Sequence, residues 1–155
     1  MAGVARLAPS IAERMRTRAF ARLADRDLDA EIDLADWPSL GPVQGAALAL
    51  TAEPTHGAPA TFVGLGERGK PAETVGDEAV TELLAFLDAG PGAVDPHSAD
   101  QILLPLALAP GRSEYTVTAV TEHLRTNAAT IRAFLDRDIA IEAERDDRPG
   151  RVVVA

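Results

Sequence analysis

His123 lies at a position in the sequence that favours phosphate chemistry. It follows residues 115–121, whose alternating apolar pattern predicts a strand, and it precedes Thr126, a suitable N-cap for a helix over residues 126–135. Backbone amides converge at a helix N-terminus and favour phosphate, and neutral imidazole is a competent nucleophile toward phosphorus. His123 is therefore the candidate nucleophile, although a lone histidine at such a junction is more often structural.

The segment Gly64-Leu65-Gly66-Glu67-Arg68-Gly69 has the G-x-G-x-x-G spacing of dinucleotide-binding turns. Glycines at this spacing let a pyrophosphate approach the backbone at a helix N-terminus. A dinucleotide site also needs an acidic residue about 20 positions further on, at the end of a parallel strand. That distance falls on Asp88, at the end of a predicted helix, so a glycine-rich turn is the better interpretation. Nucleotide binding by the glycine segment stays open as an alternative.

A metal site of the histidine-rich or thiolate type is not predicted. The three histidines, His56, His97 and His123, are scattered without the spacing of zinc ligands, and the chain has no cysteine. The adjacent acids Asp146 and Asp147 fall in a polar turn and are most simply solvated.

The first predicted helix begins at a capping box that runs from Ser10 to Glu13. Apolar residues then recur at every fourth position and define a buried stripe, which consists of Ile11, Met15, Ala19 and Leu23. A row of arginines lies on a neighbouring face, namely Arg14, Arg18 and Arg22. This row predicts either a solvated face balanced by acids elsewhere or a contact with a nucleic-acid backbone.

The remaining elements follow from periodicity and turn residues. Strands are predicted over residues 28–34, 46–52, 61–64, 115–121, 139–144 and 151–154. Helices are predicted over residues 71–88, 98–108 and 126–135. Pro105 should bend the second of these helices because it cannot donate to the Gln101 carbonyl. The Gly90-Pro91-Gly92 break is the predicted domain boundary.

The composition limits the partners of the chain. It has 155 residues, no cysteine and a formal net charge of −9. This acidity argues against broad electrostatic capture of nucleic acid, so any such contact needs a local basic patch or a bound metal. No segment reaches the ~18 apolar residues of a membrane helix, and none has the form of a signal peptide. A cytoplasmic protein with no membrane association is therefore expected.

Two stretches resemble the RNA 3'-terminal phosphate cyclase family. Residues 98–108 match the family pattern A-D-Q-hydrophobic-L-L-P, and residues 120–127 match its H-x-x-T-N pattern. The turn at Gly66–Gly69 with the Ala72-Glu73 pair is also like the family, as is the segment at residues 2–4. The resemblance spans nearly the whole chain, and its motifs are specific.

The resemblance implies an ATP-dependent enzyme of the ligase class that converts an RNA 3'-phosphate end to a 2',3'-cyclic phosphate. His123 would attack the α-phosphorus of ATP and hold AMP as a histidinyl adduct. Asp100 matches the essential aspartate of the family and would organise the phosphates and a divalent metal, Mg²⁺ or Mn²⁺. His97 falls where the family places a ring against adenine, and Gln101 would contact the nucleotide. Taken alone, Asp100 could be a first-turn helix carboxylate and His97 a loop histidine.

The family also implies an α+β fold. Residues 1–92 are expected to form a small thioredoxin-like inserted domain, with a short stub of the large domain at residues 1–5. Residues 93–155 are expected to form the last α+β repeat unit of the catalytic domain.

The chain departs from the family in length. Full-length members are far longer, and their amino-terminal half carries further nucleotide contacts and an R-G-x-x-P-x-G-G-G signature that is absent here. We therefore expect a carboxy-terminal half that pairs with an amino-terminal half or self-associates, because its incomplete sheet would expose apolar edges. The alternative is a non-catalytic cyclase-like RNA-processing protein or an inactive fragment. His123 argues against the former, since the non-catalytic relatives lack that nucleophile.

Overall fold

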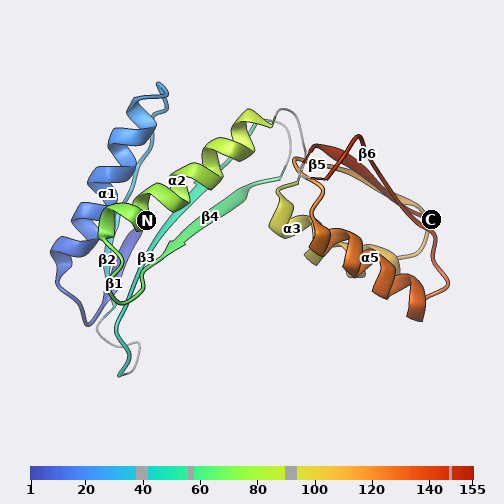
Figure 1. Ribbon diagram of the computed structural model, residues 1–155, viewed down its shortest axis with the longest axis horizontal. Helices are drawn as coiled ribbons and strands as arrows, with labels where there is room; N and C mark the ends of the chain where they lie inside the picture. The colour runs from blue at the N-terminus through green and yellow to red at the C-terminus, as the bar shows by residue number, and fades with distance from the viewer. Residues whose placement is uncertain (38–41, 56–57, 90–93, 147) are drawn as a thin grey trace. The chain divides into compact units, whose positions relative to one another are not determined.

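The computed structural model of the chain has two β-sheets with helices packed on them (Figure 1). It describes all residues except 38–41, 56–57, 90–93 and 147. This arrangement confirms the predicted α+β class. The chain divides into two compact units, Met1–Ala52 with Thr61–Ala85 and Glu53–Ala60 with Phe86–Ala155. The predicted boundary at Gly90–Gly92 lies outside the described residues.

The sheet of the first unit has four strands in the order β2-β1-β3-β4. Their bounds are Ala2–Ala5 for β1, Leu34–Asp36 for β2, Gly45–Ala52 for β3 and Ala60–Leu65 for β4. β1 is parallel to β2 and antiparallel to β3. The strands expected over residues 46–52 and 61–64 are thus confirmed. The strand expected over residues 28–34 is wrong, because pairing with β1 begins only at Leu34.

The helices α1, Pro9–Ala24, and α2, Ala72–Asp88, pack against this sheet (Figure 1). The buried face of α1 consists of Ala12, Met15, Ala19 and Leu23, which confirms most of the predicted stripe. The predicted capping box at Ser10 is wrong. The N-cap lies two residues earlier, at Ala8, which makes no side-chain hydrogen bond, and the helix begins at Pro9. Proline at the first helical position is preorganised for this start.

The arginine row of α1 meets acids of α2. Arg14 pairs with Glu73 at 2.7 Å, and Arg18 and Arg22 both pair with Asp77 at 2.8 Å. Desolvation raises the pKa of Asp77, but the hydrogen bonds from its two arginines outweigh it and lower the pKa below its ordinary value. The acids that balance the row therefore come from the neighbouring helix, which favours the solvated-face interpretation over a nucleic-acid contact.

The second unit has a three-stranded antiparallel sheet in the order β5-β7-β6. Its elements are α3 at Pro96–Gln101, α4 at Leu103–Leu108, β5 at Ser113–Val117, α5 at Glu122–Phe134, β6 at Ile139–Ala143 and β7 at Gly150–Val154. Leu103, Leu124 and Val152 lie in one buried core. None of the helices in the described ranges is long and apolar enough to cross a membrane.

The helix predicted over residues 98–108 is two short helices. It begins at Pro96, and it is interrupted at Ile102. The interruption lies just after Gln101, whose carbonyl oxygen cannot receive a bond from Pro105 because proline has no amide hydrogen. The expected effect of Pro105 is therefore confirmed, as a break rather than a bend.

Candidate functional site

His123 is the second residue of α5. The helix is capped by Thr121, whose Oγ1 accepts a hydrogen bond from the Leu124 amide at 3.2 Å. His123 is therefore exposed in the first turn, at the end where free amides point out of the helix. The predicted N-cap, Thr126, is wrong. It lies inside the helix, where its carbonyl oxygen accepts a hydrogen bond from the Thr130 hydroxyl at 2.9 Å.

The other predicted site residues lie in α3. Asp95 caps this helix, since its Oδ1 accepts from the amides of His97 and Ser98 at 2.9 and 3.0 Å. His97 is exposed in the first turn. Asp100 is half-buried and Gln101 is exposed, both in the last turn. The sequence motif thus places three candidate ligand-binding side chains within six residues of one short helix.

Two side-chain hydrogen bonds connect α3 to neighbouring elements. The Asn127 side-chain amide in α5 donates to the Asp100 main-chain carbonyl oxygen at 2.7 Å. The buried Tyr115 hydroxyl of β5 donates to the Ala99 carbonyl oxygen at 2.8 Å. Asn127 lies four residues after His123, and residues four apart share one face of an α-helix. The structure therefore brings His123 and the main chain at Asp100 to the same side of α5.

Ionisable side chains lie close to Asp100 and in the helix that carries His123. Burial raises the pKa of the Tyr115 hydroxyl above its ordinary value, and the negative charge of Asp100 adds to the effect. Arg125, two residues after His123, donates from Nε to Asp146 Oδ1 at 2.6 Å. Asp146 is an exposed turn residue, as predicted, and it also has a cationic partner. Asp147 lies outside the described residues.

The candidate site offers one carboxylate to a metal ion. The described residues hold no group of three or more histidine, cysteine, aspartate or glutamate side chains that could bind a metal. Mg²⁺ commonly binds through one or two carboxylates and the phosphates of a substrate, and it keeps several waters. Asp100 can supply one such carboxylate, so the donor set is compatible with a metal that arrives with a nucleotide.

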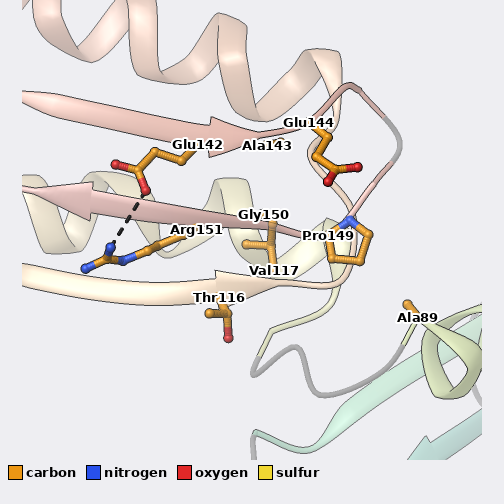
Figure 2. A pocket seen from close by; sticks show the side chains of 9 residues that line it. All are labelled: Ala89, Thr116, Val117, Glu142, Ala143, Glu144, Pro149, Gly150 and Arg151. Carbon is orange, nitrogen blue, oxygen red and sulfur yellow. Dashed lines mark ion pairs between the residues drawn. The ribbon is translucent and has the colours of Figure 1, made fainter.

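A hollow at the edge of the second sheet lies apart from the predicted site residues. Figure 2 shows its lining, which includes Thr116 of β5, Glu142 of β6 and Arg151 of β7. Arg151 Nη1 lies 3.7 Å from Glu142 Oε2 across the rim. None of His97, Asp100, Gln101 and His123 lines it. This hollow therefore does not supply a nucleotide pocket around the candidate nucleophile.

The glycine-rich turn of the first unit serves close packing. A side chain at Gly64 would clash with the Val75 carbonyl oxygen of α2, and one at Gly66 would lie 2.9 Å from Ala46 Cβ. Lys70, just after the turn, is held by the Leu65 carbonyl oxygen and by Glu78, each at 3.0 Å. A cavity of about 680 Å³ borders the turn and is lined by, among others, Arg68 and Gln44. The glycines thus have a structural role, whether or not this cavity binds a ligand.

Some residues that hold the candidate site were not identified from the sequence. Asp95 and Thr121 had a usable signal, because each is a good N-cap residue directly before a helix start, followed by Pro96 and Glu122 respectively. The role of Asn127 had no such signal in the sequence. Its partner is a main-chain carbonyl 27 residues away, which no local pattern encodes.

Comparison with known proteins identifies relatives of both units. A family model described as RNA 3'-terminal phosphate cyclase, insert domain, matches residues 1–88. An RNA 3'-terminal phosphate cyclase of Methanopyrus kandleri is 39% identical over 156 residues, which is 96% of this chain and 43% of that protein. One from Pyrobaculum neutrophilum is 42% identical over 137 residues, which is 88% of this chain and 39% of that protein. One from Caldivirga maquilingensis is 49% identical over 102 residues, 66% of this chain and 28% of that protein. The chain spans less than half the length of each of these relatives.

Proposed function

Because the chain belongs to the RNA 3'-terminal phosphate cyclase family, we propose that it carries the nucleophile of an ATP-dependent RNA 3'-phosphate cyclase. The product is a 2',3'-cyclic phosphate at the RNA end. The observation that supports the proposal is the Asn127 hydrogen bond, which joins the helix that carries His123 to the main chain at Asp100. In this proposal, His123 and Asp100 act on one ligand.

The proposed reaction begins at the exposed imidazole of His123. A ring nitrogen attacks the α-phosphorus of ATP, and pyrophosphate leaves. An oxygen of the RNA 3'-phosphate then displaces the histidine from phosphorus and takes up AMP. The neighbouring ribose 2'-hydroxyl loses its proton, attacks the 3'-phosphorus and expels AMP, which closes the ring. The first turn of α5 supports the first step, since its amides favour negative charge on the phosphate.

The α3 residues have binding roles in this proposal. Asp100 supplies a carboxylate to a divalent metal, Mg²⁺ or Mn²⁺, which would offset charge on the triphosphate. His97 and Gln101 lie four residues apart and therefore share one face of α3, which suits contacts to one bound nucleotide. His97 would stack on adenine, and Gln101 would donate to the nucleotide.

In this proposal, a partner supplies further walls of the site. Neither of the two cavities described above is lined by His123 or Asp100, and the chain spans less than half the length of these relatives. Large apolar side chains of the second unit are also exposed, namely Leu104, Leu108 and Phe134. We therefore infer that the chain pairs with the amino-terminal half of a cyclase or with a second copy of itself, because such surface is commonly covered by a partner.

The experiment uses ATP labelled at its α-phosphate together with Mg²⁺ or Mn²⁺. The chain is incubated alone and with the amino-terminal part of a full-length relative. The expected result is a covalent label that is lost in acid and survives alkali, as a phosphorus–nitrogen bond requires. His123→Ala should abolish the label, whereas Thr130→Ala, an exposed change on the same helix, should leave it intact. If neither preparation takes up label while a full-length relative does, a non-catalytic relative or an inactive fragment is the better account.

The cavity beside the glycine-rich turn supports a second candidate function, nucleotide binding in the first unit. Arg68 lines this cavity and makes no ion pair among the described residues. Nucleotide binding that is lost with Arg68→Ala and kept with His123→Ala would favour this function. The reverse result would favour the site at His123.

A further inference from the structure

Asn127 occupies a half-buried position on α5 that faces α3. Its side-chain amide donates to the Asp100 carbonyl oxygen at 2.7 Å, across 27 residues of sequence. The Tyr115 hydroxyl donates to the preceding carbonyl oxygen, that of Ala99, at 2.8 Å. Side chains from a helix and a strand therefore bind two consecutive carbonyls of the same helical turn.

These two hydrogen bonds stabilise a helix that is too short to be stable on its own. The helix has six residues, and isolated helices of that length are unstable in water. It ends at the break before Pro105, so its last carbonyls need donors from outside the helix. Burial of Ala99 fixes which face of α3 turns inward. A hydrogen bond to a defined carbonyl fixes in addition the rotation and the height of the turn that carries Asp100.

The same helix carries the proposed nucleophile. His123 and Asn127 are four residues apart on α5, so they share a face and lie about 5–6 Å apart at Cβ. A shift of Asp100 relative to Asn127 is therefore also a shift relative to His123. Displacements of about 1 Å in a reacting assembly can lower a rate by about 100-fold.

We propose that Asn127 is a positioning residue, which holds the Asp100 turn of α3 in register with His123 so that both act on one metal–nucleotide ligand. This inference rests on the proposed cyclase function. Asn127 itself does not contact the nucleotide. Its loss acts through Asp100, and the effect should therefore fall on the use of metal rather than on the nucleophile.

The test compares Asn127→Ala with Thr130→Ala, which removes a side-chain hydrogen bond of α5 that does not reach α3. Labelling of His123 is measured as a function of Mg²⁺ concentration, on folded protein with the amino-terminal part of a relative present. Asn127→Ala should raise the Mg²⁺ concentration for half-maximal labelling about 10-fold, with recovery at high Mg²⁺. Thr130→Ala should not change that concentration. A purely structural role would lower the folded fraction and leave the metal dependence unchanged.

Hydrogen exchange gives a readout that does not depend on activity. The amides of Ala99 and Ile102 donate within α3, to the carbonyl oxygens of Asp95 and Ser98. Both should exchange faster in Asn127→Ala than in Thr130→Ala, with the β7 amides unchanged as reference. The positioning role alone is overturned if exchange in α3 is unchanged in Asn127→Ala. It is also overturned if the parent is labelled and Asn127→Ala has an unchanged Mg²⁺ requirement. A parent that takes up no label overturns the cyclase function, and the positioning role with it.

Discussion

Glu114 on the outer face of the second sheet accepts ion pairs from two arginines. Arg112 Nη2 and Arg151 Nε each lie 2.6 Å from one of its carboxylate oxygens. The hydrogen bonds from Arg151 and Arg112 lower the pKa of Glu114 from its ordinary 4.5 to about 2. The folded state therefore binds a proton at this carboxylate less tightly than the unfolded state does.

Glu114 should make the stability of the second unit depend on acid pH. Its stabilising contribution is complete above pH 4.5, and it is lost as the pH falls through this window to about 2. Glu114→Gln should remove this contribution, so that the urea midpoint of the variant falls less steeply over the same window. Urea unfolding at a series of acid pH values measures the slopes. Parallel slopes for the two proteins would show that the arginine pairs do not stabilise the fold.

At the same scale, the sequence identified His123 and Asp100 as candidates, but not the hydrogen bond that joins α5 to the main chain at Asp100. Both residue types are recognisable because their chemistry and their motif are local. The Asn127 bond depends on two helices meeting in space, and its acceptor is a main-chain carbonyl that every residue has. Thr126 and Thr121 are equally good cap residues by type, and the helix uses Thr121, which comes earlier.

Among the elements, β4 and α2 approach closely because of Gly64. The strand alternates buried and exposed residues, and Gly64 lies on the buried side beneath the Val75 carbonyl oxygen. Any side chain at this position would meet the backbone of a helix, which cannot turn aside as a flexible side chain can. The glycine thus sets the distance between the sheet and the helix.

Gly64→Ala should destabilise the first unit by about 1–3 kcal/mol, because overpacking against backbone forces the helix away from the sheet. Gly45→Ala is the matched control. Its added Cβ meets nothing within 4 Å, so it should be neutral or stabilising by about 0.4–1 kcal/mol. Urea unfolding followed by Trp37 fluorescence measures both. Equal midpoints for the two variants would mean that α2 is free to move on β4.

Elements with one buried face could be predicted from periodicity, and those defined by their partners could not. β3, β4 and α2 each bury one side against the core, so their apolar spacing reveals them. Residues 28–34 alternate in the same way, yet the paired register with β1 runs only from Leu34 to Asp36. Alternation of apolar and polar residues indicates that one face of a segment is buried. A strand also requires a neighbouring strand to which it hydrogen-bonds, and the local sequence does not specify that neighbour.

For the whole molecule, the two compact units can be observed separately with natural probes. The chain has one tryptophan and one tyrosine. Trp37 belongs to the first unit, where its ring lies against Gly3. Tyr115 lies in the buried core of the second unit together with Leu103. Every residue of that core belongs to the second unit among the described residues.

Leu103→Ala should therefore destabilise the second unit without changing the first. Leu103 is fully buried, and truncation of such a leucine costs about 2–5 kcal/mol through lost burial and the cavity left behind. In urea, the midpoint of the Tyr115 near-ultraviolet signal should fall, while that of Trp37 fluorescence stays constant. Leu104→Ala is the control, because its side chain is 46% exposed and its loss should leave both midpoints in place. A joint fall of both midpoints in Leu103→Ala would show that the two units unfold as one cooperative body.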